Sequence, residues 1–220
     1  MKYEKAIKYD NRSFLRIYLD LLKREHIIIF TFINCNDYNL LNIKLVRFIF
    51  YFSTDMAMNA IFFSDDSMHK IFLNYGKYDF IQQIPQIIYS TIVSQLLEVF
   101  LCFLTMTDKY FYLIKNLTKV DDSIKIKKIF RCINMKLTFF FIFTFIFLSF
   151  YWYIIASFCA VYQNTQYIFI KDSLSSFFIG LLYPFVLYLI PTTLRYISLK
   201  YKKKKNLDVL YALSDKIPIF

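Results

Sequence analysis

The sequence predicts an all-α polytopic membrane protein with four transmembrane helices, an N-terminal amphipathic helix and a cytosolic helical hairpin. Residues 137–161 contain no charged side chain, and a transmembrane helix needs about 20 mostly apolar residues to cross the hydrocarbon core. The chain is 58% hydrophobic, which exceeds the roughly 45–50% typical of soluble domains. Segments rich in Lys and Arg alternate with segments poor in them, as the loops on the two sides of a membrane do.

Four apolar segments make up the predicted membrane domain. This domain covers residues 38–200, and its spans lie at about 45–63, 84–106, 137–161 and 174–197. The last two spans are assigned from their hydropathy alone. The first two carry Arg47, Asp55 and Glu98, so their assignment also depends on the charges of the loops around them.

The loop charges predict the orientation of the chain. Loops 64–83 and 162–173 contain few basic residues, whereas segments 1–37, 107–136 and 201–220 are rich in Lys and Arg. Because cytosolic loops retain positive charge, we expect the three basic segments to be cytosolic. The chain is then an integral protein of the plasma membrane or an endomembrane, with both termini in the cytosol.

Each cytosolic segment has its own pattern. Residues 13–22, SFLRIYLDLL, are expected to form an amphipathic helix on the cytosolic leaflet. Residues 108–136 are expected to continue the second and third spans as a helical hairpin, which turns at 120–123 with an Asp as the cap of its second helix. The tail contains four consecutive lysines, Lys202, Lys203, Lys204 and Lys205. These lysines are expected to contact anionic lipid head groups, or to act only as a stop-transfer signal that fixes orientation.

Two prolines interrupt the fourth predicted span. Pro184 and Pro191 lie on nearly the same side of a helix. Each removes a backbone N–H donor, so we expect a kink or a broken helix there.

Two acidic residues within the predicted spans are the sharpest candidates for chemistry. Asp55 and Glu98 lie in the first and second spans, and a carboxylate in hydrocarbon requires a partner or water. They either line an ion or proton path, or bond to Ser and Thr of neighbouring helices, and the second reading is the commoner one in helix bundles. Arg47 is expected to be an anchor that extends its charge to the cytosolic surface.

The other polar residues predict no metal centre, no cofactor and no catalytic activity. Asp65 and Asp66 follow the first span, but a calcium site needs six or more oxygen ligands, so a solvated outer loop is the better reading. The chain has four cysteines without CxxC spacing and two histidines, both outside the spans. Neither a zinc framework nor a nucleophile paired with a base follows from them.

The order of elements resembles a known membrane region. The first span ends MAMNAIFFSDD, and IPQIIYSTIVSQLLEVFLCFL follows a short loop; WYIIASFCAVYQNTQ and KDSLSSFFIGLLYPFVLYLIP follow a basic loop. This order is similar to the membrane segments that follow the lipase-like β-sandwich of polycystin-1-type proteins. The phrases FCAVYQNTQ and SDDSMHKI also resemble a membrane region of large uncharacterised protist surface proteins. The resemblance covers residues 27–200 and implies a multi-pass membrane module without defined catalytic or ligand-binding residues.

The expected function is therefore that of a non-enzymatic membrane module. Following the resemblance, it is a polycystin-like accessory or receptor-type component that acts through helix contacts with partner subunits. The alternative is an ion channel or transporter component that uses Asp55 and Glu98. The net charge of +11 is attributed to cytosolic loops rather than to nucleic-acid binding. The expected partners are the lipid bilayer, anionic lipids at its cytosolic face, and another membrane protein or a second copy of the chain.

Overall fold

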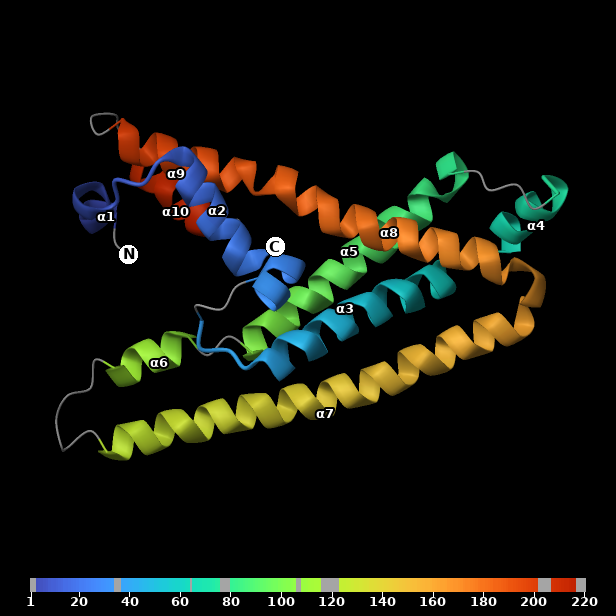
Figure 1. Ribbon diagram of the computed structural model, residues 1–220, viewed down its shortest axis with the longest axis horizontal. Helices are drawn as coiled ribbons and strands as arrows, with labels where there is room; N and C mark the ends of the chain where they lie inside the picture. The colour runs from blue at the N-terminus through green and yellow to red at the C-terminus, as the bar shows by residue number, and fades with distance from the viewer. Residues whose placement is uncertain are drawn as a thin grey trace. The chain divides into compact units, whose positions relative to one another are not determined.

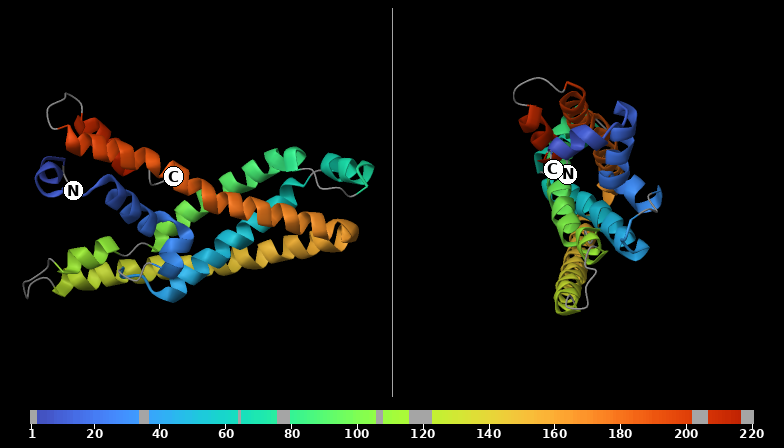
Figure 2. Two further views of the ribbon diagram at one scale, coloured as in Figure 1. Left: turned by 45° about the horizontal axis from the view of Figure 1, so that its top comes forward. Right: turned by 90° about the vertical axis from the view of Figure 1, so that its left-hand side faces the viewer.

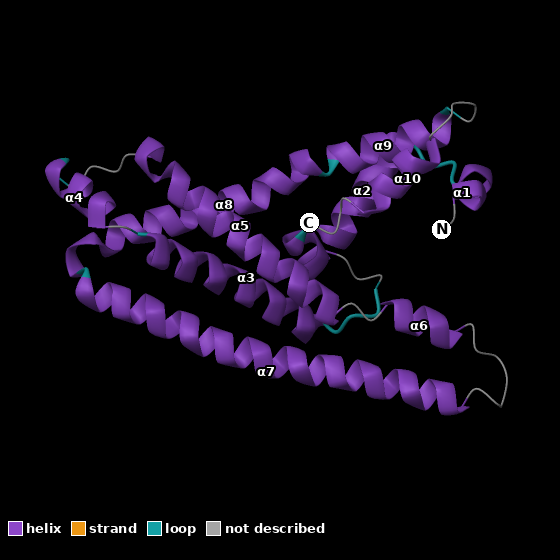
Figure 3. Cartoon of the chain, turned by 180° about the vertical axis from the view of Figure 1, so that it is seen from behind, coloured by secondary structure: helices purple, strands orange, loops and turns teal. Residues whose placement is uncertain are grey.

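The computed structural model describes residues 3–33, 37–63, 65–75, 80–105, 108–115, 123–201 and 207–216. These residues form helices joined by turns and loops, and they contain no strand (Figure 3). The predicted all-α class is thereby confirmed. The chain divides into two compact units, one formed by residues 1–35 with 180–220 and the other by residues 36–179.

The second unit contains the longest helices. Its elements are α3 (Leu41–Phe62), α4 (Asp65–Leu73), α5 (Phe80–Thr105), α6 (Asp108–Lys115), α7 (Ser123–Val161), the short 3₁₀ turn η3 (Gln163–Thr165) and the first part of α8 (Gln166–Leu187). Helix α3 contacts both α5 and α7 and lies between them (Figures 1 and 2). It therefore has neighbours on two sides, which makes it the central helix of this unit.

Aromatic residues form much of the contact between α3 and α7. Phe50 is fully buried, and its ring lies 5.6 Å from that of Tyr151 and 6.0 Å from that of Phe143. Phe143 and Phe147, one turn apart on α7, stack at 4.2 Å. Buried aromatic rings contribute large apolar areas and specific ring geometry, so this seam holds α7 against α3.

Among the described residues, three helical segments are long and apolar enough to cross a membrane: Gln83–Thr105, Ser123–Val161 and Gln163–Lys200. They correspond to the second, third and fourth predicted spans. The first predicted span, 45–63, falls on α3, which is not among these three. Helix α3 has 22 residues, but its charged residues reduce its mean hydropathy.

The arms of the predicted cytosolic hairpin are helical. Helix α7 has 39 residues, or about 58 Å at 1.5 Å per residue, and it runs unbroken from Ser123 through the apolar segment. The hydrocarbon core is about 30 Å thick, so α7 is about twice as long as a span requires. Helix α6 forms the other arm, while the predicted turn and its capping Asp121 or Asp122 lie outside the described residues.

The first unit consists of the N-terminal and C-terminal segments of the chain. Its elements are α1 (Tyr3–Tyr9), α2 (Phe14–Glu25), the π-helical turn η1 (Ile29–Ile33), the end of α8, α9 (Leu189–Lys200) and α10 (Leu207–Lys216). The Oγ of Ser13 accepts a hydrogen bond from the backbone N–H of Arg16, which caps the first turn of α2. Ile17 packs with Ala6, Leu199 and Tyr211. The apolar face of α2 thus packs against protein at Ile17, while Leu15 and Leu19 of the same helix are exposed.

The predicted break in the last span is present. Helix α8 ends at Leu187 and α9 begins at Leu189, between Pro184 and Pro191. Pro191 has no N–H for the carbonyl of Leu187, and its ring would clash with that carbonyl in a continuous helix. The break follows directly from the position of Pro191.

The C-terminal tail contains a helix, whereas only a basic segment was expected there. Residues Leu207–Lys216 form α10, which packs against α9 and buries Leu207 and Tyr211. The predicted head-group lysines, Lys202, Lys203, Lys204 and Lys205, lie outside the described residues.

Candidate functional site

A row of buried polar side chains runs along one face of α3. Arg47, Tyr51, Asp55 and Asn59 are spaced four residues apart, and each is less than 5% exposed. Residues at i and i+4 lie one above the other on a helix, so the four side chains form a single stripe. The stripe extends about 18 Å at 1.5 Å per residue.

A matching row lies on α5, at the same spacing. It consists of Gln86, Ser90, Ser94 and Glu98, all buried. The two rows meet in antiparallel order, since Arg47 donates to Glu98, the Nε2 of Gln95 donates to the Tyr51 hydroxyl at 2.8 Å, and the Nε2 of Gln86 donates to the carbonyl of Asn59 at 3.0 Å. We call these two rows, with Gln95 and with Ser176 of α8, the polar ladder.

Arg47 and Glu98 form a buried ion pair at one end of the polar ladder. The side chains of Arg47 and Glu98 are 5% and 11% exposed. The expectation that Arg47 extends to the membrane surface is therefore wrong, because α5 supplies a carboxylate within its reach. Removing one partner of such a pair leaves a buried charge uncompensated and costs about 3–5 kcal/mol.

A second ion pair lies one turn away from this end. The Nζ of Lys44 is 2.8 Å from Asp37, and both side chains are under 10% exposed. Together the two pairs place four ionised groups, with no net charge, at the same end of α3. This arrangement is typical of charged residues inside helix bundles, which pair with one another.

Asp55 occupies the middle of the polar ladder and is fully buried. Its Oδ1 accepts a hydrogen bond from the Oγ of Ser176 at 2.9 Å, and its Oδ2 faces the Nδ2 of Asn59 at 3.4 Å. Ser176 in turn lies 2.8 Å from the Oγ of Ser90. Asp55 therefore connects three helices, α3, α8 and α5, through neutral hydroxyl and amide donors.

The two carboxylates that begin α4 do not gather into a site with other described residues. Asp65 and Asp66 begin α4 and are exposed, and the Tyr162 hydroxyl donates to Asp65 at 3.2 Å. Within the described ranges, no group of three or more His, Cys, Asp or Glu side chains is arranged to hold a metal ion. Among the described residues, Cys102, Cys132 and Cys159 form no disulfide bond.

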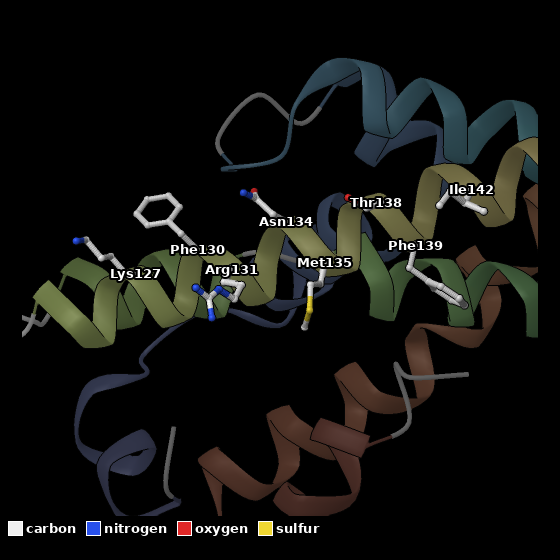
Figure 4. Close-up of a pocket in the computed structure, with 8 residues that line it drawn as sticks. All are labelled: Lys127, Phe130, Arg131, Asn134, Met135, Thr138, Phe139 and Ile142. Carbon is white, nitrogen blue, oxygen red and sulfur yellow. The ribbon is translucent and has the colours of Figure 1, made fainter.

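A broad hollow of about 670 Å³ lies along a single face of α7. Its walls change from basic to apolar along the helix, and the residues that line it are Lys127, Phe130, Arg131, Asn134, Met135, Thr138, Phe139 and Ile142 (Figure 4). Arg131, Met135 and Phe139 point to the same side of the helix. Neither Asp55 nor Glu98 lines this hollow.

The first unit has a separate charged cluster around Asp10. The guanidinium of Arg12 donates to Asp10 at 2.6 and 2.7 Å, and an amino group of Arg195 lies 3.6 Å from the same carboxylate. These hydrogen bonds favour the ionised form and hold the pKa of Asp10 below its ordinary value, although partial burial opposes them. In the same unit, burial lowers the pKa of His26, whose Nε2 lies 2.8 Å from the carbonyl of Leu181.

The sequence points to part of the polar ladder. Asp55, Glu98 and Arg47 stand out as charged residues in apolar spans, whereas Asn59 and Gln86 do not. The signal that was available is the i, i+4 recurrence of polar side chains on both helices, in spans that are otherwise apolar.

No family model matches the chain, and neither does any curated protein or solved structure. The resemblance to the membrane region of polycystin-1-type proteins thus stays a resemblance of pattern, and function has to be argued from the residues themselves.

Proposed function

We propose that the chain is a non-enzymatic multi-pass membrane module, a polycystin-like accessory or receptor-type component that acts through helix contacts with partner subunits. The observation that supports this best is that both intramembrane carboxylates are bonded inside the bundle, Glu98 to Arg47 and Asp55 to Ser176. Carboxylates held in this way join α3 to α5 and α8. Apolar side chains then cover the outward faces of the helices.

The proposed topology has four spans, with α3 as the first and both termini in the cytosol of a plasma-membrane or endomembrane protein. Helix α3 is about 33 Å long at 1.5 Å per residue, which suffices for a core of about 30 Å. Its charged residues are Lys44, Arg47 and Asp55, and all three are buried within the second unit. Transmembrane helices tolerate charged side chains when those side chains face the interior of the bundle.

The exposed side of α7 is the proposed contact surface. Phe145, Ile146 and Tyr153 are 73%, 58% and 70% exposed, although they belong to the apolar segment. In a bilayer such a surface faces either acyl chains or the helix of another protein. The proposal is that a partner subunit covers part of it.

Photo-crosslinking from α7 tests this contact. A benzophenone amino acid replaces Phe145 in one variant and the fully buried Phe140 in a matched control, and both are irradiated in native membranes. We expect a discrete protein adduct from position 145 and none from position 140. Adducts with lipid alone at position 145 would contradict the proposal.

A flux assay separates this function from the channel or transporter alternative. Purified protein in liposomes is expected to give no cation or proton flux above empty liposomes. Flux that is present in the wild type and lost in Asp55→Asn and Glu98→Gln would replace the proposed function with the alternative.

A further inference from the structure

Among the residues that the structure describes, Asp55 has no charged partner. It is fully buried, and the groups that donate to it, Ser176 and Asn59, are neutral. Within the described part of the chain, no Lys, Arg or His lies at ion-pair distance from its carboxylate, since Arg47 is engaged by Glu98. A buried carboxylate is stable only when a proton or a cation compensates its charge.

Two amide oxygens of the polar ladder, from Asn59 and Gln86, also have no donor in the described part of the chain. The Nδ2 of Asn59 donates to the backbone carbonyl of Asp55 at 3.0 Å and faces the Asp55 carboxylate at 3.4 Å. This fixes the amide, and its Oδ1 has no hydrogen-bond partner. The Nε2 of Gln86 donates to the carbonyl of Asn59, and its Oε1 likewise has no partner. Both side chains are more than nine-tenths buried, where an unmatched acceptor is costly.

We propose that Asp55, Asn59 and Gln86 bind a monovalent hard cation such as Na⁺ between α3 and α5. Carboxylate, amide and hydroxyl oxygens are the ligands that hard cations take in proteins, and Ser90 and Ser94 of the polar ladder add hydroxyls on the facing helix. One carboxylate balances one positive charge, so a divalent ion would leave an excess. A proton on Asp55 would neutralise the charge but would leave the oxygens of Asn59 and Gln86 unmatched.

Thermal unfolding of the purified chain in detergent tests the site. NaCl is replaced stepwise by choline chloride at constant ionic strength, because choline is too large to enter. We expect the unfolding midpoint of the wild type to be higher in NaCl by about 4 °C when Na⁺ is well above its dissociation constant. Equal midpoints in the two salts would overturn the proposal, because a proton alone gives no dependence on Na⁺.

Two variants assign the effect to the site. Asp55→Asn keeps the shape of the side chain and removes its charge, so the difference between the two salts is expected to vanish. Thr144→Ala removes a buried hydroxyl of α7 that bonds within its own helix, to the carbonyl of Phe140 at 2.8 Å, and it is expected to retain the difference. A difference that persists in Asp55→Asn would overturn the proposal.

Direct binding of ²²Na⁺ keeps the proposal testable if Asp55→Asn does not fold. The wild type is expected to bind ²²Na⁺ in competition with unlabelled Na⁺ and not with choline. Gln86→Leu, which lies towards the end of the polar ladder, is expected to weaken binding about tenfold through the loss of one neutral ligand. Unchanged affinity in Gln86→Leu would exclude this residue as a ligand, and no binding by the wild type would overturn the site.

Discussion

Single residues in this chain bring together segments that are far apart in the sequence. Asp10 accepts two hydrogen bonds from the guanidinium of Arg12 and lies 3.6 Å from Arg195. The same carboxylate therefore links the start of α2 to α9. A carboxylate held by two guanidinium groups is stabilised only while it is ionised.

The pKa of Asp10 predicts a dependence of stability on pH. Its pKa is lower in the folded state than in the unfolded state, so the unfolded state binds more protons as the pH falls. The stabilisation is fully present above the ordinary aspartate pKa of about 3.9, and it is lost as the pH falls through the folded value.

Unfolding midpoints of the wild type and Asp10→Asn, compared between pH 6 and pH 3, measure this effect. We expect a constant advantage of the wild type near pH 6 and a shrinking one below about pH 4. An advantage that stays the same down to pH 3 would show that the contribution of Asp10 does not depend on its charge.

At this scale, the sequence predicts which residues are unusual but not what they contact. Asp55 and Glu98 stand out because carboxylates are rare in apolar spans. Their partners could not be predicted, because Arg47 and Ser176 meet them only after the helices pack. The spacing of four residues between Arg47 and Tyr51 is visible in the sequence. A single sequence does not show, however, that the polar row of α3 faces the polar row of α5.

Helices in this chain could be predicted where a local sequence feature, such as an apolar run or a proline, determines the helix or its end. Helix α7 follows from its apolar run, α2 from its amphipathic pattern, and the end of α8 from Pro191. Helix α10 was not predicted because its helical spacing is short and follows a run of lysines, which indicates a basic tail. The residues with this spacing are Leu207, Leu210, Tyr211 and Ser214. Short helices of this kind depend on tertiary packing for their stability.

Replacing Pro191 with Ala is expected to join α8 and α9 into one helix, because the new N–H donates to the carbonyl of Leu187. Spin labels on the exposed positions Leu182 and Thr193 measure the result. We expect their backbone separation to approach about 16 Å, the value for a continuous helix, with a narrower distribution. Pro184→Ala is the matched control and is expected to leave the break in place, and a break that survives in Pro191→Ala would point to another cause.

For the whole molecule, the sequence predicts the class better than the arrangement. Three of the four predicted spans coincide with helices long and apolar enough to cross a membrane, because span length and hydropathy are set by the bilayer. The division into two units was not predicted. It joins the first 35 residues to the last 41, and contacts between the ends of a chain leave no local signal.

The proposed topology predicts where glycans can be attached. Asn116 is followed by Leu and Thr, which is an acceptor sequence for N-glycosylation, but it lies in a loop proposed to be cytosolic. We expect no glycan on Asn116 when the chain is expressed in a eukaryotic secretory system.

An acceptor engineered on the other side is the matched test. Tyr75 is 96% exposed and has a φ of +52°, a conformation that Asn tolerates well. Tyr75→Asn with Lys77→Thr creates an acceptor sequence in loop 64–83, and we expect a glycan there, seen as a mass shift that a glycosidase removes. A glycan on Asn116 would reverse the proposed orientation.

The burial of Arg47 bears on how the protein is made. A charged residue within a span raises the free energy of insertion, by about 2.5–3.5 kcal/mol at the centre of the helix and by less towards the end at which Arg47 lies. In the proposed topology α3 leaves the ribosome before Glu98, the partner of Arg47 on α5, has been synthesised. We therefore expect the translocation machinery to retain α3 until α5 arrives, so that the two helices enter the lipid as a pair. On this view the contact between Arg47 and Glu98 is first a condition for biogenesis, and only afterwards a feature of the finished bundle.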